Sequence, residues 1–200
     1  MIISMSDIIC VTNRALCAGD FSQRIRQIAS ARPAGIILRE KDLTEEAYEV
    51  LAGEILRICR EYQVLCMLHS FVKAAQRLEA EAIHLPMPVL REMTGEQKQC
   101  FQVIGASCHS VEEAKEAERL GCTYLTAGHI FNTDCKKGLP GRGLDFLQNI
   151  CSSVSVPVYA IGGIDNSNIE AVRLAGAKGA CIMSGLMKCR DPVSYMRTFK

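Results

Sequence analysis

Leu120-Gly121-Cys122-Thr123-Tyr124-Leu125 is similar to two other stretches of the chain, Leu78-Glu79-Ala80-Glu81-Ala82-Ile83 and Ala175-Gly176-Ala177-Lys178-Gly179-Ala180-Cys181. Each stretch has the pattern of a helix end, a tight turn and the beginning of a strand. Repetition of one strand–helix unit is typical of α/β proteins. The repeat therefore predicts a chain built from successive βα units.

Short apolar runs mark the expected strands. Near-continuous hydrophobicity, rather than alternation, is typical of parallel strands buried on both faces. About eight such runs predict an α/β fold, a single-domain (β/α)8 TIM barrel over residues 1–200, small beside the usual ~250 residues. The alternative is a doubly wound open sheet, but Val11-Thr12-Asn13-Arg14 lacks the glycine fingerprint expected after its first strand. The runs are Ile8–Val11, Gly35–Leu38, Val64–Leu68, Ala82–Leu85, Val103–Ser107, Tyr124–Phe131, Val156–Ile161 and Ala180–Met183.

The segments between these runs carry helix signals: capping residues, apolar residues at helical spacing and closing glycines. Phe21–Ala31 and Gly143–Ser152 show weaker helical patterns. The clearer helices begin at the cap Asp42-Leu43-Thr44-Glu45 and run to Tyr62, from Ser110 to Gly121, and from Ser167 to Gly176.

The composition is that of an ordinary globular protein, with 48% hydrophobic and 22% charged residues. The net charge of +1 gives no reason to expect a nucleic-acid or anionic-membrane partner. The N-terminal residues lack the basic region of a signal peptide, and no apolar run approaches the roughly 20 residues that span a bilayer. The 11 cysteines include no C-x-x-C pair or zinc-type His/Cys spacing, which predicts reduced thiols in a cytoplasmic protein.

Polar and small residues follow the expected strands, where a barrel of this type carries its active site. The loop from Gly128 to Gly143 has His129 at its root and Lys136-Lys137 in its middle, which favours a functional role. Arg39 and Lys41 follow the second strand, and the ordinary alternative is a surface turn in which they pair with Glu40 and Asp42. His69 and His109 follow the third and fifth strands, and His84 lies at the end of the fourth.

Two glycine-containing turns predict a phosphate site. Gly162-Gly163 follows the seventh strand directly before an expected helix, and Ser184-Gly185 follows the eighth. Backbone N–H groups at a helix N-terminus bind anions, and the loops after strands seven and eight form the usual phosphate site of such barrels. We expect phosphate on Gly162, Gly163, Ser184 and Gly185, with the Met183 amide as a further donor; ordinary tight turns are the alternative.

These motifs together resemble the thiamine-phosphate synthase/TenI superfamily over nearly the whole chain. The resemblance rests on Leu38-Arg39-Glu40-Lys41-Asp42-Leu43, Ile83-His84-Leu85, Gly105-Ala106-Ser107-Cys108-His109-Ser110 and Ala160-Ile161-Gly162-Gly163-Ile164. The stretch Gly128-His129-Ile130-Phe131-Asn132-Thr133-Asp134-Cys135-Lys136-Lys137-Gly138 is more similar to TenI than to the synthase. TenI-type proteins are thiazole tautomerases. The resemblance thus implies aromatisation of a carboxythiazole phosphate in thiamine biosynthesis, without a cofactor.

The resemblance also implies site residues. His129 matches the catalytic histidine of TenI, and Thr133 stands near the thiazole. Arg39, Lys41, Ser107 and Lys136 match diphosphate-binding positions of the synthase. Without a diphosphate, these cations are free for the substrate carboxylate, and Arg39 is the first choice because a guanidinium binds a carboxylate through two parallel hydrogen bonds. His84 belongs to a pattern shared with the synthase, and we expect it to be structural.

Two alternatives remain. The synthase joins a thiazole phosphate to a pyrimidine diphosphate and needs Mg²⁺. Its Asn-Asp pair is replaced by His69-Ser70, and its Gly-Gln-x-Asp run by Pro86-Met87-Pro88-Val89, so both metal-binding carboxylates are missing. We therefore expect no metal site. A barrel that only binds a thiazole or thiamine phosphate is the second alternative. The expected partner is a small phosphorylated thiazole, and the sequence leaves a homodimer open.

Overall fold

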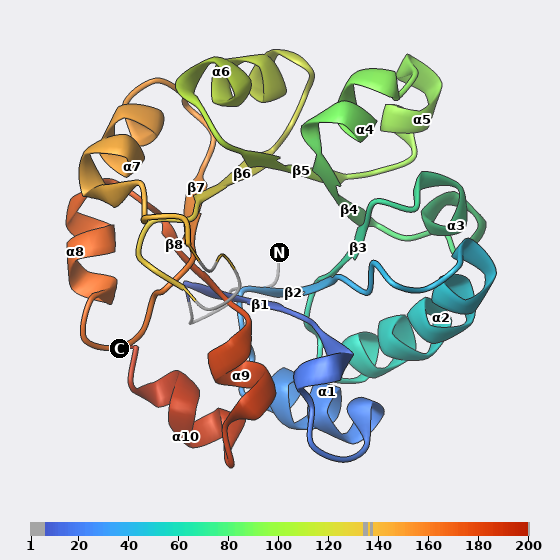
Figure 1. Ribbon diagram of the computed structural model, residues 1–200. Coiled ribbons are helices and arrows are strands. Elements are labelled where there is room, and N and C mark those ends of the chain that lie inside the picture. The colour runs from blue at the N-terminus through green and yellow to red at the C-terminus, as the bar shows by residue number, and fades with distance from the viewer. Residues whose placement is uncertain (1–6, 134–135, 137, 200) are drawn as a thin grey trace.

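The computed structural model describes residues 7–133, 136 and 138–199. Eight parallel strands close into one barrel, in which each strand pairs with its neighbours in sequence and β1 pairs with β8 (Figure 1). This confirms the single-domain (β/α)8 TIM barrel. The strands are β1 (Ile8–Val11), β2 (Gly35–Leu38), β3 (Cys66–His69), β4 (Ala82–Pro86), β5 (Val103–Cys108), β6 (Tyr124–Gly128), β7 (Val158–Ile161) and β8 (Gly179–Ile182).

Helices form a ring around the barrel (Figure 1). Their apolar sides and the outer strand faces form one continuous core, which includes Ile25, Ile55 and Leu147. The helices are η1 (Arg14–Leu16, a short 3₁₀ turn), α1 (Phe21–Ser30), α2 (Glu45–Glu61), α3 (Val72–Arg77), α4 (Met87–Glu92), α5 (Gly95–Gln99), α6 (Val111–Arg119), α7 (Gly143–Cys151), α8 (Ile169–Leu174), α9 (Ser184–Lys188) and α10 (Pro192–Arg197).

A second, smaller core fills the inside of the barrel. It is formed by side chains from alternate positions of the strands, among them Val11, Ile37, Met67 and Tyr124. In this interior the packing is dense enough to require glycine at position 105, where a Cβ would lie 2.1 Å from the ring of Tyr124. The barrel interior is therefore a packed core rather than a channel.

Three strands are at least two residues shorter at one end than the sequence predicts. The strand expected over Tyr124–Phe131 ends at Gly128, because the returning loop binds the next two carbonyls through Arg142 N (3.0 Å) and Gly143 N (2.9 Å). β3 begins at Cys66 rather than Val64, since the Val64 N–H donates to the Cys59 carbonyl at the end of α2 (2.9 Å). β7 begins at Val158 rather than Val156, whose N–H donates to Glu118.

The expected helix signals were right for α6 and partly right elsewhere. Ser110 caps α6 by accepting from Glu113 N, and Gly121 follows its end with φ +94°. α2 is capped by Thr44 rather than Asp42, and α8 starts after Asn168 rather than Ser167. The sequence reading missed the short elements η1, α3, α4, α5, α9 and α10, because each has too few residues for a helical period to be recognised.

All cysteines that the structure describes are free thiols. Several of them, including Cys10, Cys66 and Cys181, are buried among apolar residues and pack as small hydrophobic side chains. Among residues 7–133, 136 and 138–199, no helix has the length and apolarity needed to cross a membrane.

Candidate active site

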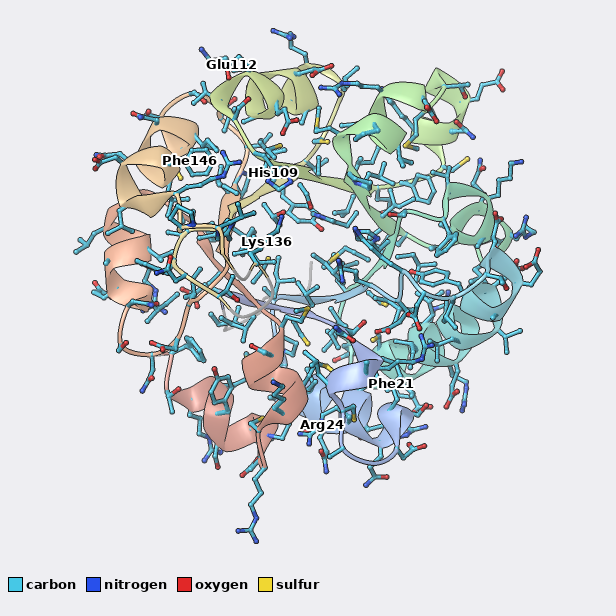
Figure 2. The ribbon with its side chains drawn as sticks, viewed as in Figure 1. Phe21, Arg24, His109, Glu112, Lys136 and Phe146 are labelled. Atoms are coloured by element: carbon cyan, nitrogen blue, oxygen red, sulfur yellow. The ribbon has the colours of Figure 1, made fainter. Side chains whose placement is uncertain are left out.

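A large open cavity of about 1840 Å³ lies at the carboxyl ends of the strands. Every residue that the sequence predicts for the site contributes to its wall. Figure 2 shows His109 and Lys136 over the mouth of the barrel, whereas Glu112 and Phe146 lie on the helical ring. The predicted residues in the wall are Arg39, Lys41, Ser107, His129, Thr133, Lys136, Gly162, Gly163, Met183, Ser184 and Gly185.

Three cations form one side of the cavity. Arg39 and Lys41 extend from the end of β2, and Lys136 comes from the loop after β6. Burial lowers the pKa of Lys41, and the positive charges of Arg39 and Lys136 lower it further. Neighbouring positive charges repel one another, and a bound anion would relieve this repulsion.

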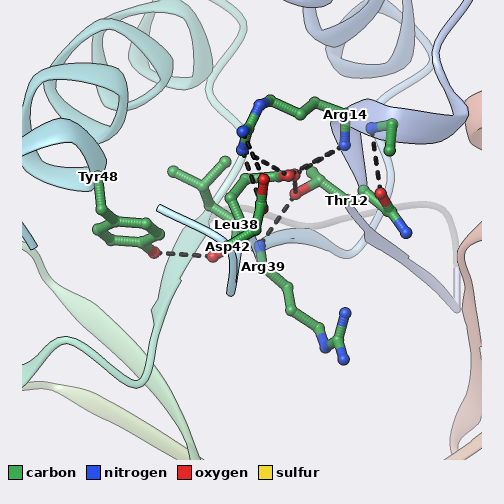
Figure 3. Close-up of polar contacts among 9 residues, drawn as sticks. Thr12, Arg14, Leu38, Arg39, Asp42 and Tyr48 are labelled. Carbon is green, nitrogen blue, oxygen red and sulfur yellow. Dashed lines mark hydrogen bonds and ion pairs between the residues drawn. The ribbon is translucent and has the colours of Figure 1, made fainter. Parts of the chain in front are cut away.

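The acidic residues beside these cations are held by a different arginine (Figure 3). Glu40 is only 2% exposed; its carboxylate accepts from Thr12 Oγ1 (2.6 Å) and from Arg14 N (3.0 and 3.1 Å). Asp42 accepts two hydrogen bonds from the Arg14 guanidinium, at 3.1 and 2.6 Å. In the part of the chain that the structure describes, no carboxylate pairs with Arg39 or Lys41. The alternative in which these cations pair with Glu40 and Asp42 is therefore wrong.

The backbone at Arg39 is fixed from the same side. Its N–H donates to Thr12 Oγ1 (2.9 Å), and this hydroxyl donates onward to Glu40. Its guanidinium extends away from the network (Figure 3). The Tyr48 hydroxyl, which reaches in from α2, donates to the Leu38 carbonyl (2.7 Å) and accepts from His69 N (2.8 Å). These bonds set the position from which the Arg39 side chain enters the cavity.

His129 lies where the chain leaves β6. Its backbone carbonyl accepts from Arg142 N, and the next residue, Ile130, donates to the Ile161 carbonyl (2.9 Å). The imidazole is half-buried, and its Nε2 lies 3.3 Å from the Leu139 carbonyl oxygen. The loop from Gly128 to Gly143 thus closes on its own root and holds the ring at the cavity wall.

The two turns that the sequence predicts to bind phosphate differ in structure. Gly162 and Gly163 have φ of +101° and +67°, and no described acceptor takes their N–H groups. The expectation that they lead directly into a helix is wrong, because α8 begins only at Ile169. An Asx-type turn at Asp165–Asn168 intervenes, in which Asn168 also donates to the Gly163 carbonyl (2.9 Å). Ser184 and Gly185, by contrast, form the first turn of α9, where N–H groups have no partner within the helix.

The remaining histidines are in different environments. Burial lowers the pKa of His84 to about 3, and its ring nitrogens contact the Tyr124 hydroxyl and Ser107 Oγ, both at 2.8 Å. Burial, followed by the charges of His84, Arg39 and Lys41, lowers the pKa of His69 to about 2. His69 Nδ1 contacts Ser70 Oγ (2.7 Å). Both imidazoles are therefore neutral near pH 7.

A Mg²⁺ ion of the kind the synthase uses does not fit these residues. Mg²⁺ is held by carboxylates and water. Among the described residues of the cavity wall, Asp165 alone carries a carboxylate. Its Oδ1 already accepts from Ser167 N (2.8 Å) and Ser167 Oγ (2.6 Å). The ends of β3 and β4 carry no carboxylate; the residues there are His69, Ser70 and Pro86.

Sequence reasoning missed several residues that build the site. Thr12, Arg14 and Tyr124 hold other site residues, and Arg142 ties the long loop to the His109 carbonyl through Nη1 (2.5 Å). The sequence did offer one hint, since Glu40 stands between the two cations Arg39 and Lys41. Its burial could not be predicted, because its hydrogen-bond partners Thr12 and Arg14 follow a different strand, β1.

The fold and the cavity define a (β/α)8 barrel with cationic side chains at its mouth. The chain matches the family described as "Thiamine monophosphate synthase" over residues 8–186, and it belongs to that family.

Relatives and one solved structure give the same result. The chain is 32% identical over 187 residues to a "Thiamine-phosphate synthase" of Fusobacterium nucleatum, covering 90% of this chain and 89% of that protein. It is 36% identical over 173 residues to a protein of the same name from Pyrococcus abyssi, covering 84% and 81%. The solved "Thiamine phosphate pyrophosphorylase from Pyrococcus furiosus" superposes with a TM-score of 0.81 at 28% identity, covering 96% and 92%.

Proposed function

We propose that this member of the family is a metal-independent thiazole tautomerase, which aromatises a carboxythiazole phosphate by moving one proton. The observation that carries the proposal is the donor set of the cavity. Among the described residues of its wall, a histidine stands with three cations that have no acidic partner, and Asp165 is the one carboxylate, whereas a Mg²⁺-diphosphate reaction requires a pair.

The substrate has two anionic groups, and the cavity has a place for each. The phosphate would lie against Gly162, Gly163, Met183, Ser184 and Gly185. The carboxylate would lie against Arg39, with Lys41 and Lys136 adding positive charge and with Ser107 and Thr133 as polar contacts. Holding the ring at both ends fixes the carbon that loses its proton, and such positioning lowers the activation barrier.

His129 would carry the proton. An imidazole accepts a proton at one nitrogen and can return it from the same atom, so one residue can serve as base and then as acid. The reaction balances without another reagent, because the proton removed beside the carboxylate is returned to the exocyclic carbon. His69 and His84, which burial keeps neutral, are poorer candidates for this role.

The names of the relatives favour a second function, thiamine-phosphate synthesis from a thiazole phosphate and a pyrimidine diphosphate. One experiment separates the two. The purified protein is incubated with the unrearranged carboxythiazole phosphate, and in parallel with the two synthase substrates and Mg²⁺. We expect the aromatic isomer in the first reaction and no thiamine phosphate in the second. The reverse result would establish the synthase, and binding without turnover in either would leave a ligand-binding protein.

A further inference from the structure

A chain of hydrogen bonds runs from the interior of the barrel to the cavity. His84, Gly105 and Tyr124 are register partners on adjacent strands β4, β5 and β6. Because Gly105 has no side chain, the Tyr124 ring crosses it and brings its hydroxyl within 2.8 Å of His84 Nδ1. His84 Nε2 then lies 2.8 Å from Ser107 Oγ, which lines the cavity.

The direction of these bonds follows from the partners available. Tyr124 is 6% exposed, and among the described residues its hydroxyl has one polar contact, His84 Nδ1. If Nδ1 carried the proton, the phenolic O–H would be buried without an acceptor, which is strongly unfavourable. Tyr124 therefore donates to Nδ1. A neutral imidazole has one N–H, so the proton of His84 is on Nε2 and points at Ser107.

Ser107 Oγ receives two donors. His84 Nε2–H is the first, and Thr126 Oγ1, the register partner of Ser107 on β6, donates at 3.3 Å. A hydroxyl oxygen has two lone pairs, and both are then occupied. The Ser107 O–H is left to donate, and the open side of Ser107 is the cavity.

We propose that Tyr124 and His84 are positioning residues that fix Ser107 as a hydrogen-bond donor, so that the ligand atom beside Ser107 is an unprotonated acceptor such as a phosphate or carboxylate oxygen. A ligand that presents a hydroxyl or amine hydrogen there is rejected, because Ser107 has no lone pair to offer it. The inference concerns the same cavity as the proposed function and rests on its anionic ligand. It holds for tautomerase and synthase chemistry alike.

The first test reads the tautomer of His84 directly and needs no ligand. Nitrogen-15 NMR of the wild-type protein near pH 7 distinguishes a protonated from an unprotonated ring nitrogen. We expect the proton on Nε2, and a shift of the population toward Nδ1 in Tyr124→Phe. A wild-type proton on Nδ1 would overturn the proposal whatever reaction the protein catalyses.

The second test measures affinity, with inorganic pyrophosphate as the probe in calorimetry without metal. Loss of a hydrogen bond to a charged acceptor lowers affinity by about 10- to 100-fold. We expect such a loss for both Ser107→Ala and Tyr124→Phe, and no further loss in the double variant, because both changes remove the same bond. Tyr159→Phe is the matched control, since the Tyr159 ring packs edge-on against Tyr124 but is absent from the cavity wall.

Losses that add in the double variant, or an equal loss for Tyr159→Phe, would show that Tyr124 acts only through packing. If both single variants bind pyrophosphate as the wild type does, Ser107 donates nothing to the anion. Failure of the tautomerase assay alone leaves the proposal intact, because the NMR and binding measurements do not depend on turnover.

Discussion

Gly162 lies so close to His129 that a Cβ on the glycine would be 2.4 Å from the Cβ of the histidine. The Gly162-Gly163 turn after β7 and the root of the loop after β6 are therefore packed directly against each other. Gly162 also has φ +101°, a conformation that favours glycine. The position of the histidine ring and the shape of the Gly162-Gly163 turn depend on the same residue.

Gly162→Ala is expected to damage both stability and activity. Gly19 provides a matched control, since it has the same φ of +101° but nothing within 4 Å of an added Cβ. Gly19→Ala should lower the free energy of unfolding by about 1–2 kcal/mol through backbone strain alone. Gly162→Ala should lower it further and reduce kcat, because His129 must move. Denaturant unfolding and steady-state kinetics of the two variants check this, and equal effects of the two changes would contradict the packing argument.

His129→Ala should lower kcat of the tautomerase reaction by about 10²–10⁴, the usual contribution of a positioned acid–base group. KM should change little, because the anions are held by other residues. His129→Asn keeps a polar side chain of similar size without acid–base chemistry, and it should be nearly as slow. Rates within roughly threefold of wild type, in folded variants, would make His129 a structural residue and direct attention to His69 and His109.

The acidic residues next to the cations should differ sharply in their effect on stability. Glu40→Gln disturbs a buried carboxylate that accepts from Thr12 and Arg14, and it should lower the free energy of unfolding by about 3 kcal/mol. Asp42→Asn breaks a pair on the exposed side of Arg14 and should change it by at most about 1 kcal/mol. Urea unfolding of both variants measures the difference. Equal effects would mean that the Thr12–Glu40–Arg14 contacts do not hold the end of β2.

The fold could be predicted from the sequence because a buried parallel strand has a strong local signature. The apolar runs and the repeated helix–turn–strand stretches gave the number and order of the strands, and helix caps such as Ser110 gave element starts. Strand ends such as Gly128 were misplaced, since they depend on bonds from the returning loop at Arg142 and Gly143, which are distant in sequence.

The site could be predicted only as a set of residues at strand ends. Topology brings these ends together, which is why Arg39, His129 and Gly162 line one cavity. Their polar partners could not be predicted. The pairing of Glu40 with Arg14, and of His84 with Tyr124, depends on which side chains meet across strands, and neither has a local pattern. Likewise, Gly163 looked like an anion-binding turn, but a Cβ there would lie 2.4 Å from the Asn132 carbonyl oxygen, so it is also a packing position.

The free energy of unfolding should depend on pH because two histidines are buried in the folded protein. His84 and His69 are 3% and 5% exposed, and their pKa values in the folded protein are about 3 and about 2, whereas a histidine in an unfolded chain titrates near 6.5. As the pH falls below about 6.5, these two histidines bind protons in the unfolded chain but remain neutral in the folded protein. The free energy of unfolding must therefore decrease from pH 6.5 toward pH 3, by up to about 1.4 kcal/mol per pH unit for each histidine.

Since carboxylates also titrate at the lower end, the measurement compares urea unfolding of wild type and His69→Gln at several pH values from 7 to 4.5. The variant should lose less stability per pH unit, and its disadvantage should shrink as the pH falls. Parallel curves over this range would mean that His69 accepts a proton in the folded state, and the ring would then be available for acid–base chemistry in the cavity.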